Sequence, residues 1–281
     1  MAELEEPKRL RLHWPGTGVE MFFRWIAPRG WNGEPIYARL GGRGGWRNEE
    51  PAHRVRLAGP FWLAETPVTQ AQFGLWIKAE GVEHKNNFKN RPDHPAESLD
   101  WRQAQRYCAW LTATAPRDFP AGFRACLPTE AEWEYACRGG TDTEYHTGDG
   151  EAALRQAGWF AGNSGRETQP VGGKEANPFR LRDMHGNVWE WCHDVWAADA
   201  YRRRVDGDLD PGAGARDRDW AGGWERMLAN ENPRVLRGGS WDSSAWVCRS
   251  TFRGGREPVV RLWNFGFRVC LVPGPDSQFS K

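Results

Sequence analysis

The sequence RVLRGGSWDSSAWVCRSTFR, residues 234–253, and the later stretch NFGFRVC, residues 264–270, bound the most informative part of this chain. Both outer ends read as short strands, because β-branched and aromatic residues dominate Arg234–Leu236 and Phe267–Leu271. The pair Gly238–Gly239 permits a backbone bend that a side chain would hinder. Between the two strands, apolar residues follow neither a strand period nor a helix period. We therefore predict an irregular surface segment that is held at both ends.

Composition favours one folded protein that is rich in loops. The 281 residues include 33 glycines, 19 prolines and 39% hydrophobic residues, and the mean hydropathy of −0.76 predicts no membrane span. A net charge of +1 gives no electrostatic reason to expect nucleic acid as a partner. The first residues lack the apolar stretch of a secretory signal, so we expect a cytoplasmic protein with reduced, buried cysteines. The basic residues are almost all arginine, which is compatible with a thermostable protein or with a GC-rich genome.

Three helices are predicted from capping boxes, in which a cap residue is followed three positions later by Gln or Glu. The predicted helices run from Thr69 to Gly81, from Asp100 to Pro116 and from Thr129 to Gly139. Alternating residues predict strands at 21–26, 53–58 and 60–64. After Gly140 the periodic patterns vanish for about a hundred residues, and we expect tryptophan rings to hold these loops.

We predict a single domain without internal repeats. Residues 1–20 read as an N-terminal arm, residues 21–273 as the domain and residues 274–281 as a tail. The expected fold class is α+β, with the helices that begin after Thr69 and Asp100 packed on a small mixed or antiparallel sheet and much irregular loop. Arg234–Ser240 and Phe267–Val272 are expected to be neighbouring central strands of that sheet. We expect the chain to be a monomer.

Five short motifs occur at separate places along the chain. They are WLAETPVTQ at 62–70, LPTEAEWEYA at 127–136, DMHGNVWEW at 183–191, RGGSW at 237–241 and GFR at 266–268. In this order and spacing the motifs closely resemble the formylglycine-generating-enzyme-like (sulfatase-modifying factor) family, over roughly residues 20–272. The resemblance implies a C-type-lectin-like α+β fold. Fold alone does not give function.

The enzymes of that family oxidise a cysteine of a client sulfatase with copper that two cysteines hold. At the two corresponding positions this sequence has Ser243 and Cys248. A hydroxyl is a poor ligand for the soft ion Cu(I), whereas a thiolate is a good one. We therefore expect neither copper nor catalysis, assign no catalytic residue, and interpret Cys248 as a buried thiol.

The resemblance also implies a possible structural calcium site. In the family, a side chain at the position of Asp183, main-chain oxygens at Gly186 and Val188, and a carboxylate at Glu190 hold the ion. Hard oxygen donors on a tight loop suit Ca²⁺. The alternative is that both carboxylates only accept hydrogen bonds from loop amides. In either case these residues would brace loops and take no part in catalysis.

The chain departs from the family pattern in a C-terminal variable segment, about residues 240–268. Places that the family usually fills with Asn, Asp and Arg hold Trp, Val, Leu and Phe here, while the surrounding motif residues are retained. This resembles the variable proteins of diversity-generating retroelements, in which adenine-directed mutagenesis rewrites this segment and Asn codons are the usual targets. The predicted binding residues are Asp242, Ser243, Ser244, Trp246, Val247, Gly254, Gly255, Arg256, Val259, Val260, Leu262, Trp263 and Phe265.

The predicted function is non-catalytic binding of an unknown protein or other macromolecule, with Trp246 and Trp263 as the main anchors. Two alternatives stay open: a copper-dependent formylglycine-generating oxidase, and a structural or regulatory module of the same fold. Burial of Trp246, Val260 and Trp263 together would favour the structural module, because the predicted contact face would then belong to the core.

Overall fold

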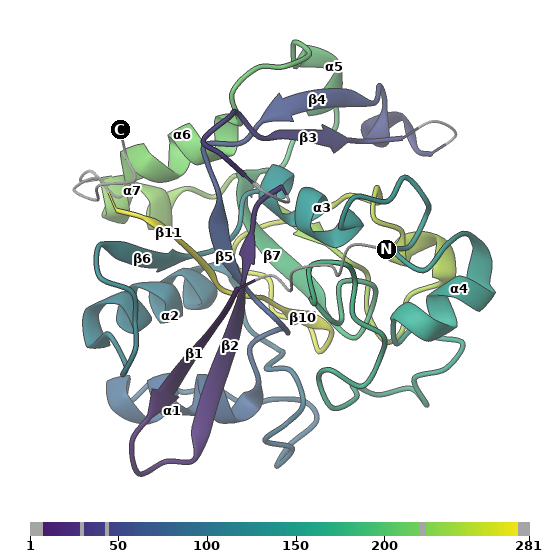
Figure 1. The fold of residues 1–281 in the computed structure, drawn as a ribbon. Helices are drawn as coiled ribbons and strands as arrows, with labels where there is room; N and C mark the ends of the chain where they lie inside the picture. Colours follow the sequence, from purple (N-terminus) through teal and green to yellow (C-terminus); the bar gives the residue numbers. More distant parts are fainter. Residues whose placement is uncertain (1–7, 29–30, 43–44, 220–222, 275–281) are drawn as a thin grey trace.

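Three β-sheets form the centre of the fold. The computed structural model describes residues 8–28, 31–42, 45–219 and 223–274. Its first sheet has five antiparallel strands in the order β1-β2-β5-β11-β6 (Figure 1). These strands are β1 (Arg9–Trp14), β2 (Val19–Ile26), β5 (Phe61–Ala64), β6 (Phe123–Cys126) and β11 (Cys270–Pro273).

The second sheet has four strands in the order β10-β7-β8-β9, and β10 runs parallel to β7. Its strands are β7 (Trp189–Val195), β8 (Arg234–Arg237), β9 (Gly254–Arg256) and β10 (Phe265–Gly266). A third sheet pairs β3 (Tyr37–Leu40) with β4 (His53–Arg56). The strands predicted at 21–26, 53–58 and 60–64 are therefore confirmed, with small differences at their ends.

The expected pairing of the strands at 234–240 and 267–272 is wrong. β8 lies between β7 and β9 in the second sheet, whereas β11 lies between β5 and β6 in the first. A strand has only two edges for main-chain hydrogen bonds, and other strands occupy both edges of β8 and of β11. The chain instead passes from the second sheet to the first through residues 267–269. The predicted single small sheet is thus replaced by three sheets within an α+β fold.

The first three helices begin and end as their capping boxes predicted. They are α1 (Gln70–Glu80), α2 (Trp101–Thr114) and α3 (Glu130–Arg138). Each cap side chain accepts the main-chain N–H three residues later. α1 and α3 end at Gly81 and Gly139, whose left-handed conformation suits glycine.

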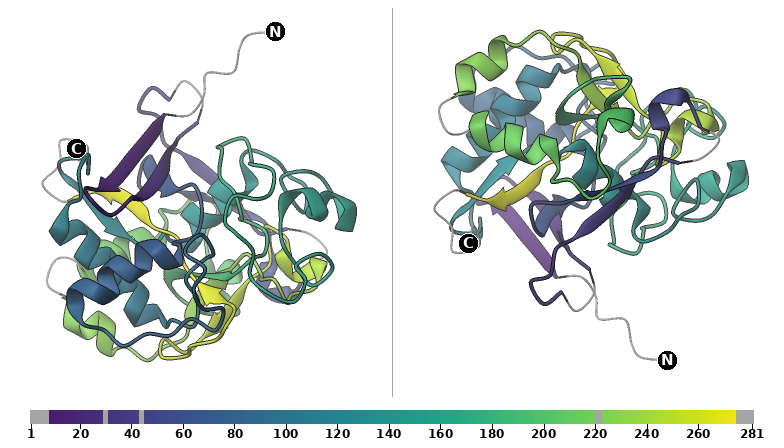
Figure 2. Two further views of the ribbon diagram at one scale, coloured as in Figure 1. Left: turned by 90° about the horizontal axis from the view of Figure 1, so that it is seen from below. Right: turned by 90° about the horizontal axis from the view of Figure 1, so that it is seen from above.

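α1 and α2 lie side by side and cover the first sheet (Figures 1 and 2). Between them and the sheet, the rings of Phe73, Tyr107 and Phe267 contact one another with centroids 5.4–5.9 Å apart, and all three are fully buried. Each such ring buries about 150–250 Å² of surface. Because Phe267 lies where the chain crosses between sheets, this cluster ties both helices to the end of the variable segment.

The part after Gly140 contains more regular structure than the sequence predicted. Its described residues include the short helices α4 (Gly150–Ala157), α5 (Ala200–Arg203), α6 (Pro211–Arg218) and α7 (Trp224–Ala229). Helices of two turns or fewer show too little periodicity to be recognised. Two tryptophans form hydrogen bonds to main-chain oxygens of distant segments. The indole of Trp101 donates to Cys192 O at 2.8 Å, and that of Trp191 donates to Leu99 O at 3.3 Å.

The domain begins earlier than predicted. Residues 9–14, which the sequence placed in the N-terminal arm, form β1 and pair with β2 along their whole length. Residues 1–7 of the arm and 275–281 of the tail lie outside the described residues. In the described part of the chain no helix is long and apolar enough to cross a membrane. All six cysteines are buried and free of disulfides, as expected.

Candidate ligand-binding surface

Three buried arginines, which we call the frame arginines, fix the backbone around the variable segment. They are Arg237 in β8, Arg253 before β9 and Arg268 before β11. The guanidinium of Arg237 pairs with Glu134 of α3 and donates to the carbonyl oxygens of Ser250 and Thr251 at 2.9 and 3.0 Å. The Arg237 side chain therefore holds the loop that follows η3 (Ala245–Cys248) against the sheet.

The other two frame arginines make bidentate ion pairs. Arg253 donates to both oxygens of Glu130 at 2.5 and 2.7 Å, and Arg268 donates to both oxygens of Glu190 at 2.6 and 2.7 Å. All four side chains are at most 1% exposed. Burial alone would raise the pKa of Glu130, but the Arg253 charge lowers it to about 2. That carboxylate is therefore ionised at neutral pH, and the pair is a fixed part of the interior.

The predicted binding residues fall into exposed and partly buried groups. The exposed ones are Asp242, Ser244, Trp246, Arg256, Val259 and Trp263. Among these, Trp246, Val259 and Trp263 expose 42%, 51% and 48% of their surface. Ser243, Val247, Gly254, Gly255, Val260 and Leu262 are partly buried. Since Trp246 and Trp263 reach solvent, the joint burial that would favour a purely structural module is not found.

Three predicted binding residues have a structural role instead. Phe265 is 4% exposed and contacts Trp191 edge-on with ring centroids 5.4 Å apart, so it belongs to the core. Gly254 and Gly255 form part of β9, and a Cβ added to Gly255 would lie 2.3 Å from Cγ of Trp196. This position therefore has no room for a side chain that contacts a ligand. Strands as short as β9 and β10 give no readable alternation in the sequence.

Asp242 joins the two halves of the variable segment. Its Oδ1 accepts from Ser240 Oγ at 2.6 Å and from Asn264 Nδ2 at 3.0 Å. Its Oδ2 accepts from the indole of Trp263, 21 positions later, at 3.4 Å. The structure therefore brings Asp242 and Trp263 to one place. The sequence reasoning missed Asn264, although Asn in an irregular stretch commonly makes such side-chain hydrogen bonds.

Trp246 lies at a second place on the surface, in η3. The guanidinium carbon of Arg249 is 3.5 Å from its ring centroid, and Arg249 Nε donates to its main-chain oxygen at 2.9 Å. Arg249 also donates to Glu49 Oε1 at 3.0 Å, and the same oxygen accepts the main-chain N–H of Trp46 at 3.1 Å. Trp46 is 61% exposed. Trp46, which lies outside the variable segment, is thus linked to Trp246 through Glu49 and Arg249. No sequence pattern indicated a role for Trp46.

The second half of the variable segment lies across the start of α2. The carbonyl oxygen of Pro258 accepts from the N–H of Trp101 at 3.2 Å, and that of Leu262 accepts from the N–H of Ser98 at 3.1 Å. These main-chain bonds fix residues 258–262 while Val259 stays exposed. The backbone is therefore held independently of the side chain at position 259.

The two positions that correspond to copper ligands converge on one main-chain amide. The N–H of Ser240 donates to Ser243 Oγ at 3.1 Å, and the same N–H also makes a hydrogen bond with the Cys248 thiol. Gly239, with φ +70°, makes this approach possible, because a Cβ there would lie 2.6 Å from Cys248 Sγ. Burial raises the pKa of Cys248 to about 12. At neutral pH the place therefore holds a protonated thiol beside a hydrogen-bonded hydroxyl.

The loop proposed for calcium is largely hydrogen-bonded within the protein. Both oxygens of Glu190 accept from Arg268, and its Oε2 also accepts from the indole of Trp133 at 2.7 Å. Asp183 Oδ2 accepts from the N–H of Gly172 at 2.6 Å. Its Oδ1 is buried without a hydrogen-bond partner among the described residues, and burial raises the Asp183 pKa to about 6. The donor set fits Ca²⁺ only in part, through this one oxygen, because Arg268 and Trp133 already bind Glu190.

The sequence matches the family model of the sulfatase-modifying factor enzyme 1-like domain over residues 33–272. Serine/threonine-protein kinase pkn1 of Chlamydia caviae is 31% identical over 82% of this chain and 36% of its own length. Formylglycine-generating enzyme of Streptomyces coelicolor is 30% identical over 79% of this chain and 81% of its own length. The chain therefore spans about a third of the Chlamydia kinase and most of the Streptomyces enzyme.

Solved structures show the same fold. Treponema denticola variable protein 1 superposes with a TM-score of 0.73 and 28% identity, over 94% of this chain and 99% of that chain. PvdO from Pseudomonas aeruginosa superposes with a TM-score of 0.70 and 23% identity, over 89% of this chain and 94% of that chain. The fold is therefore the C-type-lectin-like α+β fold that the motifs predicted. With its family model matched over most of its length, the chain belongs to the sulfatase-modifying factor enzyme 1-like, or formylglycine-generating-enzyme-like, family.

Proposed function

We propose that this protein is a non-catalytic binding protein whose variable segment displays a ligand-binding surface. One observation carries this proposal: within one segment, the frame arginines are buried while several apolar side chains are exposed. Arg268 is 0% exposed, whereas Trp263 is 48% exposed. Exposed tryptophans on a fixed, irregular backbone contribute little to a core and are typical of contact sites. The likeness to Treponema denticola variable protein 1 supports the same interpretation.

The backbone of this surface is held in a way that tolerates side-chain exchange. The N–H of Trp241 donates to Asn187 O at 2.9 Å, and the N–H of Ala161 donates to Ser243 O at 3.0 Å. These bonds, like those of Pro258 and of residue 262, involve only main-chain atoms. They therefore persist whatever side chains occupy the exposed positions 244, 246, 256, 259 and 263. A segment built in this way suits diversification.

The proposed partner is a protein or another macromolecule. Trp246, Val259 and Trp263 supply apolar contact area, and Asp242 and Arg256 supply exposed polar groups in the same segment. Aromatic anchors with a polar rim are the usual composition of a protein interface. Truncation of a true anchor of this kind weakens binding by about 2 kcal/mol or more.

A display library tests the proposal. Positions 244, 246, 256, 259 and 263 are randomised, and the library is selected for protease resistance and then for binding to hen lysozyme as an arbitrary protein probe. We expect most members to stay protease-resistant and lysozyme binders to be enriched. A matched control library randomises five buried positions: Arg237, Arg253, Phe265, Phe267 and Arg268. Equal protease sensitivity of the two libraries would contradict the proposal.

Genomic context gives a second test that needs no protein. Diversification requires a nearby reverse transcriptase gene and a near-copy of the codons for residues 240–268 that differs only where the copy has adenine. We expect both. If neither is found, the surface is a fixed one, and a structural or regulatory module becomes the better interpretation.

Copper-dependent oxidation is the second candidate function, because formylglycine-generating enzymes are relatives and Cys248 lies beside position 243. We expect Cu(I), oxygen and a cysteine-containing sulfatase peptide to leave the peptide unchanged in mass spectrometry, since Ser243 offers no thiolate. An aldehyde product would establish the oxidase instead. Ser243→Cys is the matched variant and should bind Cu(I) more tightly than the natural chain.

A further inference from the structure

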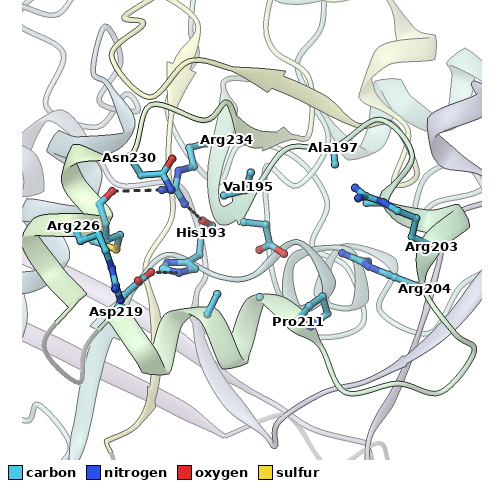
Figure 3. Close-up of a pocket in the computed structure, with 15 residues that line it drawn as sticks. His193, Val195, Ala197, Arg203, Arg204, Pro211, Asp219, Arg226, Asn230 and Arg234 are labelled. Atoms are coloured by element: carbon cyan, nitrogen blue, oxygen red, sulfur yellow. Dashed lines mark hydrogen bonds and ion pairs between the residues drawn. The ribbon is translucent and has the colours of Figure 1, made fainter.

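A cavity of about 560 Å³ lies apart from the predicted binding residues, none of which line it (Figure 3). Its walls come from the ends of β7 and β8 and from α5, α6 and α7. Charged side chains are prominent in its lining, and these are Arg203, Arg204, Arg226, Arg234, Asp194 and Asp219. The cavity is therefore a candidate site for a charged small molecule.

Four arginines and two aspartates line the cavity, and two of these arginines also have carboxylates near them outside the lining: Arg203 pairs with Asp199 at 2.9 Å, and Arg204 lies 3.8 Å from Glu130. Burial, together with the charges of Asp210 and Glu130, raises the pKa of Asp194 to about 7. This carboxyl therefore carries only part of its negative charge at neutral pH. Burial lowers the pKa of His193, which lies 3.2 Å from Asp219, so His193 contributes no full positive charge. All four arginines stay protonated at neutral pH.

Arg204 has donors that the protein leaves unused. Its side chain is 11% exposed, and its Nη1 is buried with no hydrogen-bond partner among the described residues. Its Nη2 lies 3.8 Å from Glu130 Oε2, which is beyond hydrogen-bond distance. Buried N–H groups without an acceptor are rare in folded proteins. Because Nη1 itself has almost no accessible surface, an acceptor in the cavity would satisfy this group after a small movement of the Arg204 side chain.

Arg234 approaches from the opposite wall (Figure 3). It stacks on Trp101 at 3.9 Å, and its Nη1 donates to His193 O at 3.0 Å. Its Nε is buried without a partner among the described residues, and burial lowers its pKa to about 10, which still leaves it charged at neutral pH. Guanidinium groups therefore reach the cavity from both sides, with Arg203 and Arg226 exposed at its margin.

We propose that this cavity binds a small phosphate ester. Guanidinium N–H groups match phosphate oxygens in pairs, and phosphate brings more than one negative charge to the four arginines of the lining. The cavity volume lies in the range of about 300–1,000 Å³ that is typical of small-molecule sites. Because this is more than an isolated phosphate needs, the remaining space would hold a small organic group against Ala215 and Met227. The site does not depend on the function proposed for the variable segment.

Isothermal titration calorimetry of the full chain at constant ionic strength tests the site, with inorganic phosphate and glucose 6-phosphate as probes. We expect saturable binding of one equivalent of each probe at millimolar concentration or below, and none of glucose or acetate. Arg203→Gln and Arg226→Gln alter exposed arginines of the cavity and should each weaken binding by about tenfold. Ala215→Phe, which fills the cavity without altering charge, should abolish it.

Arg202→Gln is the matched control, because Arg202 is the exposed neighbour of Arg203 on α5 and lines a different cavity. This variant should bind both phosphate probes as the natural chain does. Weakened binding in Arg202→Gln with unchanged binding in Arg203→Gln would place the anion elsewhere and overturn the proposal. So would the absence of saturable heat with both probes, or equal heat with acetate. Thermal unfolding confirms that each variant is folded.

Discussion

Replacing Arg268 by alanine should show how strongly the frame arginines hold the variable segment. Besides its two bonds to Glu190, the guanidinium donates to the carbonyl oxygens of Ala64 and Arg182 at 3.0 Å each. Without it, the indole N–H of Trp133 is the one hydrogen-bond donor that the described residues leave to the buried Glu190 carboxylate. Removing one partner of a buried ion pair costs about 3–5 kcal/mol. We expect the free energy of unfolding to fall by that amount.

Trp263→Ala is the matched change in the exposed part of the segment. The ring is 48% exposed, and its indole N–H makes only a long bond of 3.4 Å to Asp242. Substitutions at exposed positions outside special features usually change stability by about 0.5 kcal/mol or less. We expect Trp263→Ala to cost less than about 1 kcal/mol, because part of the ring still packs on its surroundings.

Urea unfolding followed by far-ultraviolet circular dichroism measures both changes, and equal m-values for the variants make their free energies comparable. Arg268→Lys adds a control, because lysine keeps the charge but loses the bidentate geometry, so its loss should be smaller than that of the alanine variant. Should Trp263→Ala prove as destabilising as Arg268→Ala, Trp263 would be part of the core. The display interpretation would then fail.

The remaining predictions concern single sites. Gly239→Ala should destabilise the fold, since φ is +70° and the new Cβ would lie 2.6 Å from Cys248 Sγ; unchanged urea unfolding would refute this close approach. If Asp183 binds Ca²⁺, chelation should lower the melting temperature, because an ion bound only by the folded state stabilises it; Asp183→Asn should remove the effect, and a melt that chelation leaves unmoved would support the hydrogen-bonding alternative. Burial lowers the pKa of His146 to about 4, below its ordinary 6.5. The stability that neutral His146 contributes is thus present above pH 6.5 and lost as pH falls towards 4, by up to about 2 kcal/mol near pH 5. Melting curves of His146→Gln should depend less on pH in that window, and an equal dependence would count against the buried, neutral histidine.

The parts of the fold that local chemistry determines were predictable from sequence. Capping boxes gave the starts of α1, α2 and α3, because a cap and its partner lie three residues apart and need no information from elsewhere in the chain. The family resemblance supplied the fold class, because five separated motifs agreed. The strands β2, β4 and β5 were also predictable, since alternation within a strand is local, whereas β1 was assigned to the arm and the short β9 and β10 were missed.

Strand pairing was not predictable, because it depends on residues far apart in the chain. Nothing in the residues around Arg237 indicates that β8 pairs with β7 and β9 and leaves β11 to another sheet. Phe265 was placed on the surface for the same reason: two residues of β10 carry no alternation, and only the contact with Trp191 shows which way the ring faces. Trp46 lies near the variable segment because its main-chain N–H and the guanidinium of Arg249 both donate to Glu49, a contact between residues far apart in the chain.

Position 243 shows why copper chemistry and the binding surface place different demands on one fold. Its hydroxyl contacts Ser240 Oγ at 2.8 Å, Ser240 donates to Asp242, and Asp242 accepts from Asn264 of the second half of the segment. A hydroxyl donates and accepts strong hydrogen bonds, whereas a thiol does both weakly. Serine at 243 therefore supports the network that joins the two halves, while it removes a ligand that Cu(I) needs. A cysteine at this position would favour the metal and weaken the same network. The serine that offers Cu(I) no thiolate is thus also a member of the hydrogen-bond network that joins the two halves of the variable segment.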